Sequence, residues 1–262
     1  MKSLPMLQYL EIPIVKHCNL NCRYCSHLSN IEDKYFISTE IYKRDVIRLS
    51  QLFSDINEMR LLGGEPLLHP HIVELIKTTR EVFPKTELKV ATNGLLIPSV
   101  DKEVLRAFSV NNVSFDISLY PPTQKIQGTI RSRLFETGVR FYFSEPISKF
   151  QKRLLLEPVS NKITAWNKCK TKNCFVLFEG KMSYCYAPQL AELVNKKCGC
   201  NFEMSDAIVD IYDEKCTGNS LLDFLLQPHS CCSYCGEPET YDWTTVICKP
   251  NISDWVVENP IQ

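Results

Sequence analysis

The sequence predicts an α/β fold in which parallel strands are joined by crossover helices. Three observations support this prediction. Segments rich in β-forming residues alternate with segments of helical periodicity over the first 160 residues. Their spacing leaves room for a helix between successive strands. Glycine, proline and asparagine follow the strand segments, where the chain must turn. The architecture is then either a doubly wound sheet or a barrel or partial barrel.

The elements follow from local signals. Helix 38–54 has apolar residues at helical spacing and opens with Ser38 and Thr39, with Glu40 close behind. Helix 71–83 begins after Pro70 and ends before Pro84, and residues 100–108 also show helical spacing. We expect strands at residues 8–15, 57–62, 87–92, 112–120 and 139–145.

The chain changes character near residue 160. Residues 174–187 read as a hairpin with Gly180 near its turn, and short cysteine-rich segments follow. Residues 1–160 hold 21 basic and 17 acidic side chains, a net charge of +4, whereas residues 161–262 hold 9 and 13, a net charge of −4. We therefore predict two domains, residues 1–160 and residues 161–262.

The overall composition narrows the class of protein. Hydrophobic residues make up 44% of the 262 residues and charged residues 23%, which is ordinary for a globular protein. There is no apolar run long enough to span a bilayer, and Glu11 and Lys16 interrupt the N-terminal segment too early for a signal peptide. We expect a cytoplasmic protein. Its net charge of zero favours neither nucleic acid nor a membrane as partner.

The 13 cysteines are the unusual feature. An odd number cannot form a fully paired disulfide framework within one chain, and a chain of this length needs none. In a reducing compartment, so many cysteines indicate metal or redox chemistry. Cys18, Cys22 and Cys25 lie close together, and the other ten lie at or beyond Cys169, so we expect two separate cysteine-dependent sites.

The first group has the spacing Cys-x3-Cys-x2-Cys and directly follows the first strand. Three thiolates in one tight loop can hold three irons of a [4Fe–4S] cluster, and the fourth iron is then open for chemistry, whereas a ferredoxin supplies four cysteines. The alternatives are three unrelated buried thiols, or a zinc site completed by a distant fourth ligand.

At these residues the chain resembles the radical S-adenosylmethionine (SAM) enzymes. The resemblance covers roughly residues 8–146, and the motifs that carry it are KHCNLNCRYCSH with Tyr24 before the third cysteine, Gly63-Gly64-Glu65-Pro66, Thr92-Asn93-Gly94, and DISLYPP with Ser118 at a strand end. It implies a partial (β/α) barrel of five or six parallel strands, with the cluster and SAM at the carboxyl ends of the strands.

The residues suit these roles. Gly63 and Gly64 let the backbone approach a ligand closely, and Glu65 can accept a hydrogen bond from the ammonium group of SAM. Asn93 and Ser118 are candidates for contacts to the ribose or methionine parts of SAM, and Tyr24 is a further candidate contact. A plain turn at the glycine pair, and capping or turn roles for Asn93 and Ser118, are the structural alternatives.

The resemblance also implies the reaction. SAM chelates the open iron, one electron from the reduced cluster cleaves it, and the 5′-deoxyadenosyl radical abstracts a hydrogen atom from the substrate. The cofactor supplies the difficult chemistry, and the protein positions and shields it. A reductant such as flavodoxin or ferredoxin would deliver the electron.

The second group resembles the SPASM and twitch extensions of the same family, which hold auxiliary clusters and open with a Cys…Gly-x4-Cys hairpin. The preferred interpretation is a single auxiliary [4Fe–4S] cluster whose ligands are Cys169, Cys185, Cys232 and Cys235. A zinc site of Cys169, Cys174, Cys232 and Cys235 is an alternative. Cys231 could replace Cys232, and a cluster built on Cys198, Cys200 and Cys216 is also possible. Cys248 has no assigned role, and most of these six remaining cysteines could be buried hydrophobes in an anaerobic host.

An auxiliary cluster with full protein ligation favours an electron carrier. The expected reaction is therefore the oxidation (dehydrogenation) of a small molecule, for example a sugar or aminocyclitol derivative in a biosynthetic pathway. Epimerisation, with a cysteine or tyrosine returning the hydrogen atom, is an alternative. So is modification of a peptide, although a first strand near residue 8 leaves no room for a leader-binding domain. An iron–sulfur electron carrier or a zinc-stabilised binding module is the non-enzymatic alternative.

Overall fold

The computed structural model describes residues 3–246 and 251–257, which form two compact units. Unit 1 comprises Met1–Leu20 and Lys34–Ser148, and unit 2 comprises Asn21–Asp33 and Lys149–Gln262. The change of unit along the chain falls near residue 148 instead of the predicted 160. Residues 21–33 group with the C-terminal part because their backbone pairs with it.

The sheet of unit 1 has the strand order β5-β4-β3-β2-β1, and each neighbouring pair is parallel. The strands are β1 (Met6–Val15), β2 (Asp55–Gly63), β3 (Glu87–Thr92), β4 (Val113–Ile117) and β5 (Arg140–Phe143). The predicted α/β class with parallel strands is thereby confirmed, and the arrangement is consistent with a partial barrel. The fourth strand ends at Ile117, so Ser118 lies just beyond it instead of within it.

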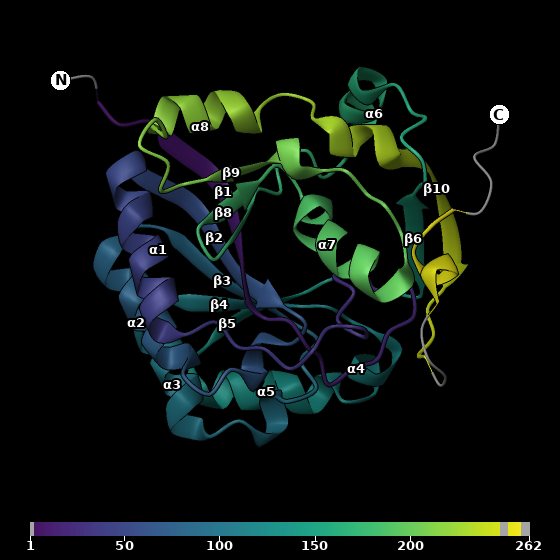
Figure 1. The fold of residues 1–262 in the computed structure, drawn as a ribbon. Helices are drawn as coiled ribbons and strands as arrows, with labels where there is room; N and C mark the ends of the chain where they lie inside the picture. Colours follow the sequence, from purple (N-terminus) through teal and green to yellow (C-terminus); the bar gives the residue numbers. More distant parts are fainter. Residues whose placement is uncertain (1–2, 247–250, 258–262) are drawn as a thin grey trace. The chain divides into compact units, whose positions relative to one another are not determined.

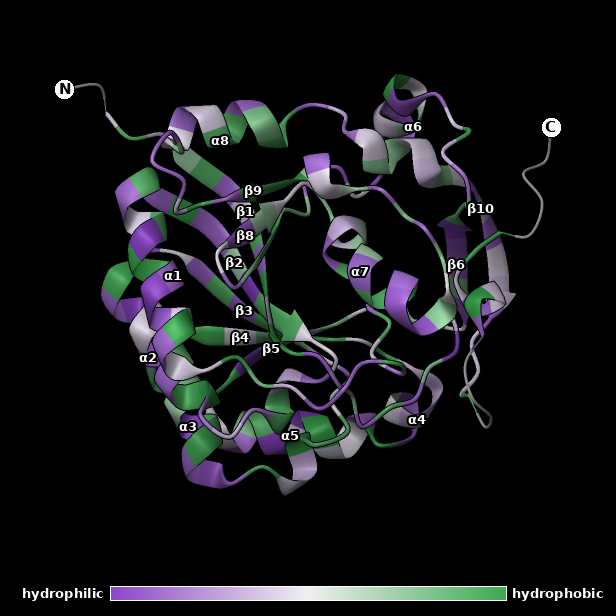
Figure 2. Ribbon diagram, viewed as in Figure 1, coloured by the Kyte–Doolittle hydropathy of each residue, from purple (hydrophilic) through white to green (hydrophobic). Residues whose placement is uncertain are grey.

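Helices connect these strands and lie on one side of them (Figure 1). They are α1 (Thr39–Leu52), α2 (Ile72–Val82), α3 (Lys102–Val110), α4 (Pro121–Lys125) and α5 (Gln127–Thr137), with short 3-10 turns η1 (Pro66–Leu68) and η2 (Ile97–Ser99). Ser38 caps α1 through its side chain, which accepts the amide of Ile41, and Asp101 caps α3 in the same way. Each helix presents both hydrophobic and hydrophilic residues (Figure 2), and α1, α2, α3 and α5 each bury apolar side chains.

Two helices of unit 1 were not expected from the sequence. Helix α5 buries Ile130, Leu134 and Thr137, but the rest of its sequence includes Gly128 and several polar residues, so its apolar periodicity is weak. Helix α4 starts with two prolines at its first turn, a position at which proline is compatible with a helix although it also signals a turn.

The strands of unit 2 pair antiparallel with one another in two groups, β7-β8-β9 and β6-β10. Strands β7 (Val176–Phe178) and β8 (Lys181–Ser183) form the predicted hairpin, whose turn places Glu179 and Gly180 at positive φ. Strand β9 (Ile208–Asp210) pairs with β8, and β6 (Lys149–Leu154) pairs with β10 (Cys235–Asp242). The predicted hairpin extended to residue 187, but residues from Tyr186 onward belong to a helix.

The remaining elements of unit 2 are the helices α6 (Lys162–Lys168), α7 (Tyr186–Cys198) and α8 (Gly218–Leu225), with 3-10 turns η3 (Ser205–Ala207), η4 (Ser230–Tyr234) and η5 (Ile252–Asp254). Strand β6 is mostly hydrophilic, with Phe150 and Leu154 as its two apolar residues, which explains why its pattern did not predict a strand (Figure 2). In the described part of the chain, no helix is long and apolar enough to cross a membrane.

Candidate cofactor sites

The glycine pair lies where β1 and β2 come into close backbone contact. A Cβ at Gly63 would lie 1.9 Å from the carbonyl oxygen of Val15, and one at Gly64 would lie 2.0 Å from that of His17. Gly63 also has φ +143°, which side chains rarely tolerate. The amide of Gly64 donates to Val15 at 2.8 Å and that of Glu65 to His17 at 3.0 Å. Both glycines are therefore required by the backbone, which goes beyond the role of a plain turn.

Glu65 follows this contact, and its side chain is fully buried. Its Oε1 accepts the Thr92 hydroxyl at 2.7 Å and the amide of Leu67 at 3.0 Å, while Oε2 accepts the amide of Asn93 at 2.9 Å. A carboxylate has about four lone-pair positions. Three are used by these bonds, so Oε2 retains capacity for one more donor, as an ammonium group would provide.

Burial raises the pKa of Glu65 to about 7, although its three hydrogen bonds oppose this shift. The carboxylate is thus held in a protein environment that favours partial protonation. A cationic ligand placed against Oε2 would return the group to its charged form, because an opposite charge stabilises the carboxylate.

Asn93 joins this carboxylate to the first cysteine. Its Nδ2 donates to Asn19 Oδ1 at 2.7 Å and lies 3.5 Å from Cys18 Sγ, and its Oδ1 accepts the amide of Leu95. These bonds engage the side chain within the protein, as its capping alternative anticipated. Ser118 is half-buried and lies at the end of β4, where its amide donates to Thr92 O.

The sulfur of Cys18 is surrounded by N–H groups. It accepts the amide of Leu20 at 3.4 Å in addition to the Asn93 amide. N–H groups directed at sulfur suit a thiolate that binds iron. Cys18 belongs to unit 1, and Cys22 and Cys25 belong to unit 2, so the expectation that they bind one cluster together rests on their spacing along the chain.

Tyr24 lies between Cys22 and Cys25 with φ +64°, an uncommon conformation for a residue with a side chain. Its ring packs against Tyr241 with 4.8 Å between centroids. Tyr24 also lines a cavity of unit 2 with a volume of about 350 Å³, together with Ser26 and Leu28 from the same loop.

The four predicted auxiliary ligands line this same cavity. Three of them are at the boundary of an element: Cys169 caps the C-terminus of α6, Cys185 caps the N-terminus of α7, and Cys235 begins β10, whereas Cys232 lies within η4. These positions fix the backbone of each cysteine. The fold therefore brings together residues that are separated by up to 66 positions in the sequence.

Cys231 joins this group. Hydrogen bonds with Cys185 and Cys232 raise the pKa of the Cys231 thiol, and the bond from Cys231 lowers the pKa of Cys232 to about 7. Burial, followed by the neighbouring Cys185, Cys232 and Cys169, raises the pKa of Cys235 to about 12. Five thiols thus lie close enough to interact, and Cys231 and Cys232 both belong to this group.

The other cysteines differ. Among the cysteines that the structure describes, Cys174 does not line this cavity. Cys198 and Cys200 are electrostatic neighbours at the end of α7. Cys248 lies outside the described residues. Within residues 3–246 and 251–257, no three His, Cys, Asp or Glu side chains are placed to share a single metal ion. In a [4Fe–4S] cluster, by contrast, each thiolate binds its own iron.

Two residues that the sequence did not single out stand out at this cavity. Tyr184 is 2% exposed, its hydroxyl has no partner in hydrogen-bonding geometry among the residues that the structure describes, and Cys169 is the first of its neighbouring thiols. Burial, with the nearby thiols, raises the pKa of Tyr184. Lys152 is 6% exposed, with Nζ 4.3 Å from the centre of the Tyr241 ring. Only the pairing of β6 with β10 brings this lysine to the cavity.

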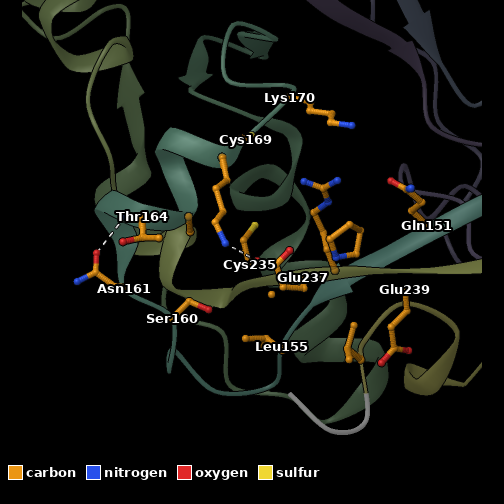
Figure 3. A pocket seen from close by; sticks show the side chains of 16 residues that line it. Gln151, Leu155, Ser160, Asn161, Thr164, Cys169, Lys170, Cys235, Glu237 and Glu239 are labelled. Carbon is orange, nitrogen blue, oxygen red and sulfur yellow. Dashed lines mark hydrogen bonds and ion pairs between the residues drawn. The ribbon is translucent and has the colours of Figure 1, made fainter. Parts of the chain in front are cut away.

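A second cavity of unit 2, of about 510 Å³, shares Cys169 and Cys235 with the first (Figure 3). Its lining includes polar side chains: Asn161 caps α6, and Lys168 pairs with Glu237 at 2.7 Å. Cys169 and Cys235 therefore line both cavities, one of which also contains residues of the Tyr24 loop.

Comparison with known proteins agrees with the geometry of unit 1. The family model of the radical SAM superfamily matches residues 12–137. This part of the chain is a radical SAM domain. That family binds a [4Fe–4S] cluster and SAM, and the sulfur environment of Cys18 and the remaining acceptor position on Glu65 fit both groups.

Individual similarities cover parts of the chain. A GTP 3′,8-cyclase of Petrotoga mobilis is 34% identical over 122 residues, which is 45% of this chain and 37% of that protein. The chain thus spans little more than a third of the length of this curated relative. Among solved structures, native anSMEcpe with bound AdoMet matches this chain with 21% identity and a TM-score of 0.44. The match covers 53% of this chain and 43% of anSMEcpe. BtrN in an open conformation matches with 18% identity and a TM-score of 0.49, over 90% of this chain and 94% of BtrN.

Proposed function

We propose that this protein is a radical SAM enzyme that oxidises a small molecule with the help of an auxiliary [4Fe–4S] cluster. The observation that carries the proposal is the cavity of about 350 Å³ in unit 2. It is lined both by residues of the first cysteine motif's loop and by the cysteines proposed to hold the auxiliary cluster. A substrate held there would lie between two redox centres.

The residues of unit 1 provide for SAM. When bound, the cluster and SAM supply a 5′-deoxyadenosyl radical that abstracts a hydrogen atom. Gly63 and Gly64 have no side chains, so the ligand can approach the backbone closely, and Glu65 Oε2 would accept a hydrogen bond from the ammonium group of SAM. Because Thr92 and Asn93 hold the carboxylate in one orientation, the methionine moiety would be fixed before reaction.

The residues of unit 2 provide for the substrate. The volume of the cavity is in the range of small-molecule sites. Its lining combines aromatic side chains with Lys152, Arg153 and Gln151, which can donate hydrogen bonds to the hydroxyl groups of a sugar or aminocyclitol. Thiolates at Cys169, Cys185, Cys235 and either Cys231 or Cys232 would hold the cluster that accepts the second electron.

Iron analysis tests the two-cluster part of this proposal. The anaerobically reconstituted protein should bind about eight irons per chain, and replacement of Cys18, Cys22 and Cys25 by alanine should leave about four. Retention of zinc with only about four irons would favour the zinc alternative for the second site.

Deuterium transfer tests the reaction. The reduced enzyme should produce 5′-deoxyadenosine from SAM, and deuterated candidate substrates should transfer label into it. A polyol or aminocyclitol that transfers label and is recovered two electrons more oxidised supports dehydrogenation. Recovery with inverted configuration supports epimerisation instead, and label from a peptide supports a maturase role. If iron-loaded protein makes no 5′-deoxyadenosine, the enzyme proposal is wrong.

A purine nucleotide is a second candidate substrate. The similarity to GTP 3′,8-cyclase favours it, although the matched region covers less than half of this chain. GTP deuterated on its ribose belongs in the same set of assays. Transfer of label from GTP, with a cyclised product, would replace dehydrogenation as the function.

A further inference from the structure

The first cysteine motif is bound to the C-terminal part of unit 2 through backbone hydrogen bonds. The amide of Arg23 donates to Thr244 O at 2.9 Å, and the amide of Val246 donates to Asn21 O at 2.8 Å. Cys22 and Thr245 form an antiparallel bridge between these bonds. The residues directly before and after Cys22 are thus hydrogen-bonded to a segment more than 200 positions away.

Side chains strengthen this attachment. Arg23 Nε lies 2.5 Å from Oδ1 of the buried Asp254, and Lys152 donates to Ser253 O at 2.8 Å. Burial of Asp254 makes this ion pair stronger than a surface pair, because water screens it less. The loop of Cys22 therefore has a defined position within unit 2.

Within this attachment, one side chain reaches the cysteine itself. The indole Nε1–H of Trp243 donates to Cys22 Sγ at 3.3 Å. Cys22 is 6% exposed, so water has little access to this sulfur. An N–H directed at a buried sulfur stabilises negative charge on it, and hydrogen bonds to the sulfurs are among the factors that set the potentials of iron–sulfur clusters.

We propose that Trp243 is a positioning residue for the SAM-binding cluster, one that holds Cys22 and raises the reduction potential of that cluster through its N–H···S hydrogen bond. The inference rests on the proposed function, because it requires a cluster at Cys18, Cys22 and Cys25. Reduction adds negative charge to the cluster and its thiolates. The Trp243 donor therefore stabilises the reduced form more than the oxidised form and eases the electron transfer on which SAM cleavage depends.

The test is the Trp243→Phe variant of the reconstituted full-length protein, titrated redox-potentiometrically and followed by electron paramagnetic resonance. The two clusters are distinguished by SAM, which alters the spectrum of the cluster with an open iron. The variant should bind as much iron as the wild type. In the variant, the equilibrium between the oxidised and reduced SAM-binding cluster should favour the oxidised form about three- to tenfold more than in the wild type. This corresponds to a reduction potential lower by about 28 to 59 mV for one electron.

Trp166→Phe is the matched control. The chain has three tryptophans, and the indole nitrogen of Trp166 makes no hydrogen bond to any described residue, although its ring packs against Lys172. The same chemical change there should leave the potential of the SAM-binding cluster unchanged. A shift of equal size in both variants would overturn the proposal.

Exchangeable protons give a second measurement. In the reduced wild type, the electron spin of the SAM-binding cluster should show a magnetic coupling to a proton, and this signal should disappear when the proton exchanges for deuterium in D₂O. Trp243→Phe should abolish this coupling. An unchanged potential and coupling in an iron-loaded variant would refute the role of Trp243 without refuting the proposed function. Absence of iron at the first motif in the wild type would instead refute the proposed function.

A third variant covers the case in which Trp243→Phe binds no iron at that motif. Trp243→His should then restore iron binding, because its ring N–H can also donate a hydrogen bond. Failure to restore it would overturn the hydrogen-bond proposal.

Discussion

Substitution of Gly64 by alanine tests whether the close approach of β1 and β2 shapes the SAM site. The added Cβ would lie 2.0 Å from His17 O, 2.3 Å from His17 C and 2.8 Å from Lys16 O. All three are backbone atoms, so no side-chain rotation can relieve the overlap. The two backbones must separate by more than about 1 Å to reach a normal carbon–oxygen contact of roughly 3.2 Å or more.

The energetic cost follows from the bonds at this point. Such a separation would break the bonds from Gly64 N–H to Val15 O and from Glu65 N–H to His17 O, now 2.8 and 3.0 Å long. Each buried group left without a partner costs about 1–3 kcal/mol, so the variant should be less stable by about 2–6 kcal/mol. Glu65 would move with the backbone, and SAM affinity should fall as well.

Gly128→Ala is the control, because its added Cβ would meet no atom within 4 Å and the residue lies in helix α5. Alanine is favoured over glycine in a helix by about 1 kcal/mol, so this variant should be slightly more stable than the wild type. The free energies of unfolding would come from urea titrations of the apo-proteins followed by circular dichroism. Equal midpoints for Gly64→Ala and Gly128→Ala would refute the reasoning.

Three further predictions concern other features. Folding raises the pKa of Glu65 from the usual 4.5 to about 7, so the folded state binds this proton more tightly than the unfolded state. The resulting stabilisation of the folded state is complete below about pH 4.5 and is lost as the pH rises through 7. The free energy of unfolding should fall by about 3 kcal/mol over this range. Urea titrations at pH 5 and pH 8 should show this loss in wild-type apo-protein and a smaller one in Glu65→Gln, and equal pH dependence would contradict the assignment. Tyr184→Phe should lower the reduction potential of the auxiliary cluster and leave that of the other cluster unchanged, since it removes a buried hydroxyl beside Cys169. An unchanged potential of the auxiliary cluster in a potentiometric titration would show that the hydroxyl has no such role. Thr217→Ala should destabilise the protein by about 1 kcal/mol, because it removes the side chain that caps α8 by accepting the amide of Ser220, and a stability within error of wild type would show that the cap contributes nothing.

Local patterns were sufficient to predict most of unit 1. The strands at 8–15, 57–62, 87–92 and 139–145 and the helices that follow the first three are confirmed, because each carries a periodicity and a boundary signal within its own sequence. Helix α5 and strand β6 lacked such signals. The first has weak periodicity, and the second is an edge strand of hydrophilic residues that exists because β10 pairs with it.

The candidate sites divide in the same way. The spacing of the first cysteines, and the resemblance to the radical SAM enzymes for the glycine pair, identified these residues, because both signals depend on neighbours along the chain. Spacing could not show that Cys231 joins Cys185 and Cys232, or that Tyr184 lies among them. Those contacts depend on where α6, α7 and β10 begin and end in space.

By itself, the sequence determined the α/β class, the parallel direction of the strands and the presence of a radical SAM motif. Only the tertiary structure decided that residues 21–33 pack with the C-terminal part of the chain, and that Trp243 donates to Cys22. The physical reason is that periodicity and turn signals act over a few residues, whereas the partner of Cys22 lies 221 positions away. Contacts over that distance depend on the packing of whole elements, which no local pattern records.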